Sequence, residues 1–225
     1  MKKLLIVAEL VSMVLSSQAT VVTFDTGQAD NDNLNTTFAS NLSADIAGAN
    51  ISNGATPNIG LTWAPYPHLD VHGTDYWNDL DPTIAGSVVD VLQLDINSGE
   101  PDPTITFAVG TGKALKLNSL DIGHETYDLS LVPYAWIFTI SEVGGPQVFT
   151  HTTALLGPGD TESVNFNFTG DLGVDYVLKL DDGGADTLHA AIDNLSFNQI
   201  PEPATFGLVG AFGLGMLFIR RRLMM

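Results

Sequence analysis

Apolar and polar residues alternate in short segments through the middle of the chain, at intervals of roughly ten residues. The clearest case is Thr104–Val109, which alternates strictly between Pro103 and Gly110. A period of two residues is typical of strands that bury one face. By the same pattern, strands are predicted at residues 20–25, 89–96, 104–109, 113–122, 134–143, 147–152, 164–168, 176–180 and 190–197.

Turn residues separate most of these segments, and no long stretch has a helical period. Short strands joined by Gly, Pro and Asp turns predict an all-β chain, folded as a single antiparallel β-sandwich. Within residues 113–122 the apolar positions change phase, which predicts a bulge near Asn118. Residues 28–60 are polar and should form long loops with short strands. The best amphipathic helix candidates are two short segments, residues 41–48 and 153–157.

The two ends of the 225-residue chain have a different composition from the middle. A basic start, an apolar segment over residues 4–15 and small residues up to Ala19 have the order of a secretory signal peptide. Signal peptidase is therefore expected to cut after Ala19. Export would place residues 20–200 outside the cytoplasm, as one domain large enough for a real core.

The last 25 residues contain a short motif, an apolar stretch and a basic cluster. The motif is Pro201, Glu202 and Pro203, and the cluster is Arg220, Arg221 and Arg222. The apolar residues between them predict a transmembrane helix over about residues 204–219, which is marginal for a hydrocarbon core about 30 Å thick. The arginines would stop it on the cytoplasmic side.

The order and position of these three elements resemble the PEP-CTERM sorting domain of Gram-negative bacteria. The resemblance implies that an exosortase, a membrane enzyme, processes the tail, and that the host makes exopolysaccharide. An ordinary membrane anchor after a proline-rich linker is the alternative. The chain is thus divided into a signal peptide (1–19), a β-sandwich domain (20–200) and a sorting tail (201–225), with the motif at 201–203 and the basic stop at 220–222.

Charge is distributed very unevenly. Only Glu9 and Glu202 of the 26 acidic residues lie outside residues 20–200, so this part carries 24 acids, three lysines and a net charge of −21. Such a domain repels nucleic acid, which is excluded as a partner. The chain has no cysteine, so thiolate metal sites and cysteine nucleophiles are excluded.

The first and last predicted strands weakly resemble the jelly-roll sandwiches of carbohydrate-binding modules. The residues concerned are 22–25 and 192–197. The resemblance implies that these strands lie close together and that Asp25 and Asp193 share a structural calcium. Asp193 is also unusual by itself, because an unpaired carboxylate in an apolar strand is costly. A solvent-facing side chain or a backbone hydrogen bond is the alternative explanation.

Residues 61–82 contain most of the large aromatic side chains, interleaved with prolines that favour a structured loop. Trp63, Tyr66 and Trp77 have the chemistry of a sugar-stacking surface, since sugars present apolar C–H faces to aromatic rings. The alternative is that these rings close one edge of the sandwich by packing into it, because each buries a large area.

No catalytic motif is present: the sequence has no nucleophile elbow, no zinc-protease motif and no complete phosphate loop. The expected function is that of an exported surface or extracellular-matrix protein with a non-catalytic β-sandwich, which binds or organises exopolysaccharide. A secreted glycan-active hydrolase remains an alternative, since two of the many carboxylates could act as a pair. A protein–protein adhesion module with the same tail is another.

Overall fold

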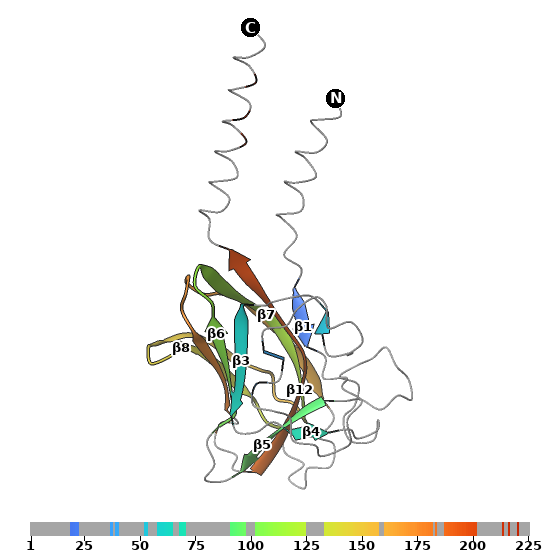
Figure 1. The fold of residues 1–225 in the computed structure, drawn as a ribbon. Coiled ribbons are helices and arrows are strands. Elements are labelled where there is room, and N and C mark those ends of the chain that lie inside the picture. The colour runs from blue at the N-terminus through green and yellow to red at the C-terminus, as the bar shows by residue number, and fades with distance from the viewer. Residues whose placement is uncertain are drawn as a thin grey trace.

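The computed structural model shows an all-β protein in which the described strands form two antiparallel sheets (Figure 1). The residues that the structure describes are 19–22, 37, 39–40, 52–53, 58–64, 68–70, 91–97, 102–124, 133–157, 160–181, 183, 187–201, 213, 216 and 220. The predicted β-sandwich class is confirmed at this level.

Sheet A has seven strands and is built around β12. The order β10-β7-β12-β1-β2 runs across it, while β5 pairs with the first part of β12 and also with β4. Its strands are β1 (Thr20–Val22), β2 (Ser52–Asn53), β4 (His68–Asp70), β5 (Val91–Asn97), β7 (Lys113–His124), β10 (Thr161–Thr169) and β12 (Thr187–Pro201).

Sheet B has five strands in the order β3-β6-β11-β8-β9. Its outermost strands, β3 and β9, therefore lie at opposite edges of the sheet. Its strands are β3 (Ile59–Ala64), β6 (Thr104–Val109), β8 (Ile137–Glu142), β9 (Gln147–Thr152) and β11 (Tyr176–Asp181).

Aromatic side chains join the two sheets across the core. The rings of Phe107 on β6 and Phe197 on β12 meet edge to face, with centroids 5.6 Å apart. Phe138 on β8 meets Phe166 on β10 in the same way at 5.7 Å. Because these contacts connect strands of different sheets, the alternation seen in the sequence buries one face of each sheet against the other.

The predicted bulge near Asn118 is confirmed by the pairing of β7 with β12. Ser196 lies opposite Ser119 and Phe197 lies opposite Leu117, so Asn118 has no partner residue of its own. The extra residue moves the buried positions of β7 from Leu115 and Leu117 to Leu120 and Ile122. The change of phase in the apolar positions of residues 113–122 thus correctly predicted a bulge in the pairing of β7 with β12.

Two predictions about local structure are wrong. Residues 153–157 are not helical, since Leu156 forms an antiparallel bridge with Tyr134 and Thr153 donates its N–H to Trp136 O at 3.0 Å. The segment 61–82 is not one loop, because β3 continues through Trp63 to Ala64 and β4 follows at His68–Asp70. The prolines of this segment come after β3 ends, so they did not prevent a strand. The helix candidate at 41–48 lies outside the described residues.

The first and last strands are neighbours, as the jelly-roll resemblance implied. β1 pairs antiparallel with β12, with Thr20 opposite Phe197 and Val22 opposite Leu195. β12 then continues to Pro201, which lies opposite Lys113. Because β1 begins beside the place where β12 ends, Thr20 and Pro201 lie at the same end of the sandwich (Figure 1).

Candidate functional site

The outer faces of the two sheets differ in how much of them is open to solvent. On sheet A the outward side chains are mixed: on β12 Ala191 is 0% exposed and Asp193 is 4% exposed, whereas the outward side chains of β10 are exposed. On sheet B, the outward side chains of Thr62, Ala64 and Ala108 are exposed, and no outward residue of this sheet is buried in the part of the chain that is described. Among the described residues, sheet B therefore presents the more open face.

Hydroxyl groups recur in rows across this open face. In one row Thr62, Thr106, Val177 and Ser141 lie on successive strands from β3 to β8. The next row contains Ala64, Thr104, Lys179, Thr139 and Thr150.

Neighbouring strands are about 4.8 Å apart, and positions i and i+2 along one strand about 6.7 Å, so the rows form a regular array. Among the hydroxyl groups of these two rows, and within the described chain, that of Thr104 donates to Ala64 O at 3.3 Å, whereas those of Thr62, Thr106 and Thr139 remain available.

One basic group stands at the centre of this array. Lys179 on β11 forms ion pairs with Asp102 and with Asp181, the latter at 3.2 Å. The side-chain hydrogen bond to Asp102 raises the pKa of Lys179 above its ordinary value, the bond to Asp181 adds to this, and partial burial acts in the opposite direction. The lysine therefore stays charged, and its charge is compensated locally.

Sheet B is nearly free of charge, although the chain carries a net charge of −18. Its strands β3, β6 and β9 contain no Asp, Glu, Lys or Arg. The remaining two contribute only Glu142, Lys179 and Asp181. We call the outward side chains of β3, β6, β11, β8 and β9 the hydroxyl face.

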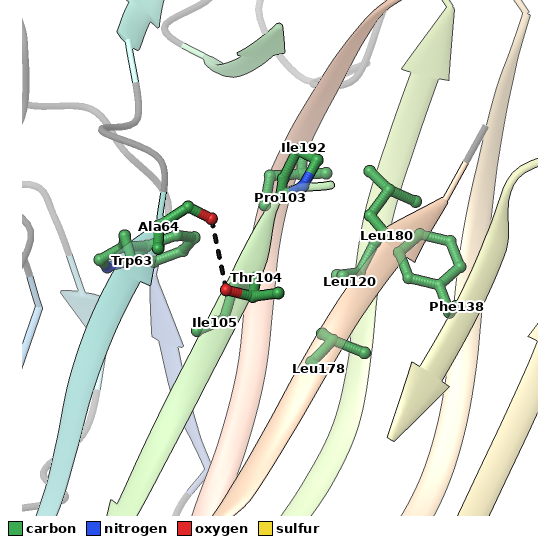
Figure 2. A pocket seen from close by; sticks show the side chains of 10 residues that line it. All are labelled: Trp63, Ala64, Pro103, Thr104, Ile105, Leu120, Phe138, Leu178, Leu180 and Ile192. Carbon is green, nitrogen blue, oxygen red and sulfur yellow. Dashed lines mark hydrogen bonds between the residues drawn. The ribbon is translucent and has the colours of Figure 1, made fainter. Parts of the chain in front are cut away.

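Trp63 does not lie on the hydroxyl face. Its side chain is 1% exposed and points from β3 into the core. Figure 2 shows Trp63 beside a small apolar cavity between the sheets, with Leu180 and Phe138 on its other sides. The cavity measures about 10 Å³, which is no more than the space of a single water molecule. A sugar ring therefore has no access to the indole in this conformation.

The other predicted aromatic residues, Tyr66 and Trp77, lie outside the described residues, so their stacking role stays a prediction. The same holds for Asp25, the first of the two predicted calcium ligands. Asp193, the second, lies on β12, where its Oδ1 accepts the N–H of Asn194 at 2.7 Å. This is the backbone hydrogen bond that the sequence offered as the alternative to a metal.

Asp193 also has a second carboxylate beside it, which the sequence did not indicate. Asp121 on β7 lies directly opposite Asp193 on β12. Its Oδ1 accepts the hydroxyl of Ser163 at 2.5 Å, and its Oδ2 accepts the side-chain N–H of Asn194 at 2.9 Å. These donors satisfy much of the Asp121 carboxylate and reduce the repulsion expected for two acids paired across strands.

This acidic pair does not make a calcium site by itself. Calcium takes about six to eight oxygen ligands, largely from carboxylates and carbonyls. Within the described part of the chain, no group of three or more His, Cys, Asp or Glu side chains could hold a metal ion. Because Asp25 lies outside the described residues, the calcium site stays a prediction, and we derive no role for a bound ion.

Two of the residues predicted for export and sorting adjoin the first and last strands of the described sandwich. Ala19 directly precedes β1, and Pro201 is the last residue of β12. Arg220 is helical and exposed, while Glu202, Pro203, Arg221 and Arg222 lie outside the described residues. No helix within the described residues is both long enough and apolar enough to cross a membrane.

Comparisons with known proteins return structural likenesses only. No protein-family model and no curated protein matches the sequence. A cyclase from Fischerella sp. TAU is similar in structure at 13% identity, with a TM-score of 0.46, over 82% of this chain and 99% of that chain. The CBM22-1 xylan-binding domain from Paenibacillus barcinonensis Xyn10C is similar at 12% identity, with a TM-score of 0.38, over 78% of this chain and 99% of that chain.

A third similar structure is CBM29-2, a family 29 carbohydrate-binding module. Its identity to this chain is 11% and its TM-score 0.37, over 82% of this chain and 93% of that chain. Likenesses at this level do not define a shared function. The class that the structure itself defines is an antiparallel β-sandwich.

The hydroxyl face was missed by the sequence analysis, although a signal for it was present. Thr-x-Thr occurs at residues 104–106 and 150–152, and Thr-x-Ser at 139–141, each on the polar side of an alternating strand. The order of the strands brings these Thr-x-Thr and Thr-x-Ser pairs onto one sheet, and this order cannot be deduced from the local sequence.

Proposed function

We propose that this chain is an exported surface or extracellular-matrix protein, sorted by its PEP-CTERM tail, whose non-catalytic β-sandwich binds neutral exopolysaccharide on the hydroxyl face. The observation that carries the proposal is the open, nearly uncharged array of hydroxyl groups on an otherwise acidic protein. A polysaccharide offers hydroxyl groups as both donors and acceptors, which threonine matches in both roles. The threonine methyl groups add apolar contact with the C–H faces of the sugar.

Charge determines which polysaccharide fits. The ion pairs of Lys179 leave no unpaired cation on the hydroxyl face to attract a uronate or a sulfate group. The remainder of the chain is strongly acidic and repels polyanions. A neutral polymer needs no unpaired cation and is not repelled by the acidic chain. We therefore expect neutral exopolysaccharide to bind and anionic polysaccharide to bind weakly.

Binding of host polysaccharide by the purified mature protein tests this proposal. The double variant Thr106→Val/Thr139→Val removes two available hydroxyl groups from β6 and β8 and preserves side-chain shape. At about 1 kcal/mol for each hydrogen bond, we expect Kd to rise by roughly tenfold or more. The matched control is Thr161→Val/Thr169→Val, which changes two exposed threonines on β10 of sheet A.

Three results would overturn the proposal. Equal Kd values for the hydroxyl-face variant and the control would show that the polysaccharide binds elsewhere. Release of reducing ends during the incubation would show that the protein is the alternative, a glycan-active hydrolase. A protein that binds no glycan but captures an envelope protein would be the adhesion module instead.

The sorting part of the proposal is tested separately. Replacing Glu202, or both Pro201 and Pro203, should trap a full-length membrane form if an exosortase-type enzyme recognises the motif. The mass of the mature C-terminus then shows whether the chain ends near Pro201 or keeps Met225. A variant that is still trimmed and released would rule out processing through this motif.

A further inference from the structure

The edge strand β9 lacks the residues that commonly protect the edge of a sheet. β9 forms the last strand of sheet B, and it contains neither proline nor a charged Asp, Glu, Lys or Arg. Proteins usually protect edge strands with such residues, because an open edge pairs readily with another strand. The hairpin that joins β8 and β9 projects from the side of the sandwich (Figure 1).

The outward backbone groups of β9 can be identified from one hydrogen bond. Thr153 donates its N–H to Trp136 O toward β8, at 3.0 Å. Since N–H directions alternate along an antiparallel strand, Ala154, Thr152 and Thr150 point away from β8. Glu162 Oε2 accepts the N–H of Ala154 at 2.8 Å. The N–H groups of Thr150 and Thr152 have no acceptor within the described protein, so this part of the edge is open.

Two of the other edges are protected. At the β3 edge of sheet B, Ser40 Oγ accepts the outward N–H of Leu61 at 2.9 Å. The β10 edge of sheet A carries Glu162 and an irregularity between Asn165 and Phe168. The irregularity of β9 lies at Val148, before Thr150 and Thr152. The side chains of Thr150 and Thr152 are exposed, and Val148 is 44% exposed.

We propose that β9 is a homodimerisation edge, at which the β9 strands of two copies pair antiparallel. Each copy carries a strongly negative net charge, so two copies repel each other as they approach. Because β9 has no charged Asp, Glu, Lys or Arg, two copies can meet there with little local repulsion. Pairing Thr150 with Thr150 of the second copy uses the open donors and brings Val148 against Thr152. The two B sheets would then form one continuous sheet and double the hydroxyl face.

The expected dimer is weak, for two reasons. Pairing through a six-residue strand gives a small interface, in the range of transient complexes. The net charge of each copy opposes association at low ionic strength, so the dimer should strengthen as added salt screens this repulsion. This dependence has the opposite sign from that of an interface held by ion pairs.

Because the chain has no cysteine, single cysteines report the contact cleanly. The full chain with Thr150→Cys should form a disulfide-linked dimer after export, since paired Cα atoms across antiparallel strands lie within disulfide range. Thr62→Cys, an exposed threonine on the opposite edge strand β3, is the matched control and should stay monomeric. Mixing the Thr150→Cys and Thr152→Cys chains detects pairing shifted by two residues, which would equally support the edge contact.

The proposal is overturned if the Thr150→Cys chain and the mixture cross-link no more than the control. Sedimentation of the full chain in detergent gives a second test. Thr150→Lys places a charge on the edge and should raise the dimer dissociation constant at least tenfold. A dimer that survives Thr150→Lys unchanged forms through another surface, such as the C-terminal segment, and also rejects the proposal. Neither test depends on polysaccharide binding.

Discussion

Asn167 on β10 and Asn194 on β12 have the same left-handed backbone conformation, with φ of 46° and 51°, on the two strands that flank β7. Each lies where the register with β7 shifts, at the level of residues 117–121. Asparagine tolerates this conformation better than most residues with a side chain. The sheet is therefore irregular on both sides of Asn118 at once, which concentrates its bending at this point.

We expect Asn194→Ala to lower the free energy of unfolding by about 1–3 kcal/mol. Alanine loses both the tolerance for positive φ and the 2.9 Å hydrogen bond from Asn194 Nδ2 to Asp121 Oδ2. Asn194→Gly keeps the backbone conformation and should cost less, while Asn167→Ala tests the backbone effect on exposed β10. Denaturant unfolding measures all three, and equal losses for Asn194→Ala and Asn194→Gly would contradict the role of φ.

The sequence predicted the strands well where alternation was strict. β6 and β11 have nearly the expected bounds, and the phase change in β7 located the bulge at Asn118. The pairing partners of β7 could not be predicted, because β7 meets β10 and β12 through contacts distant in sequence. The left-handed residues Asn167 and Asn194 were not anticipated either, since their conformation depends on the register with β7.

Trp63 should be a stability residue with little influence on ligand affinity. Because its ring is buried in the core, Trp63→Ala should lower the free energy of unfolding by about 3–5 kcal/mol. Trp63→Phe should restore part of this loss, and its Kd for polysaccharide should equal that of the wild type. Calorimetry gives the first quantity and a binding isotherm the second. A large loss of affinity for a folded Trp63→Phe variant would show that the ring contacts the ligand.

Asp193 should stabilise the protein through its hydrogen bonds. Asp193→Ala removes the acceptor for the N–H of Asn194 and should cost about 1–3 kcal/mol. Asp193→Asn keeps an acceptor oxygen and relieves the proximity to Asp121, so it should cost less. Melting curves with and without chelator complete the test. A chelator effect in the wild type that disappears in Asp193→Asn would show that calcium binds and that the hydrogen-bond account is incomplete.

Stability should fall in the alkaline range through two groups of the same strand. Burial raises the pKa of Tyr176 above 10.0, and the bond to Asp102 raises that of Lys179 above 10.5. When folding raises the pKa of a group, the group stabilises the folded protein at every pH below its pKa in the unfolded chain. This stabilisation is lost as the pH rises through the pKa of the group in the folded protein. The melting temperature should therefore decline above about pH 10.

Two variants separate these alkaline contributions. Lys179→Met should flatten the decline only slightly, since an exposed ion pair contributes at most about 1 kcal/mol. Tyr176→Phe should flatten it more, although it also removes the hydroxyl that accepts the N–H of Asp171 at 2.7 Å. An unchanged decline in both variants would assign the alkaline loss to other groups.

The candidate site was less predictable than the fold. Aromatic residues were the obvious candidates for sugar contact, yet Trp63 packs into the core because β3 turns its side chain inward. The threonines of the hydroxyl face are ordinary strand residues when taken singly. Their significance arises from the order β3-β6-β11-β8-β9, which depends on long-range pairing and cannot be deduced from local periodicity.

The continuation of β12 to Pro201 has a mechanical consequence. A tether attached beyond Pro201 would pull along the axis of a 15-residue strand that pairs with β7 on one side and with β5 and β1 on the other. Force in this direction shears many hydrogen bonds together, whereas a pull across the strand would break them one after another. A sandwich that holds a polymer while anchored at this end would thus resist drag along its strongest axis.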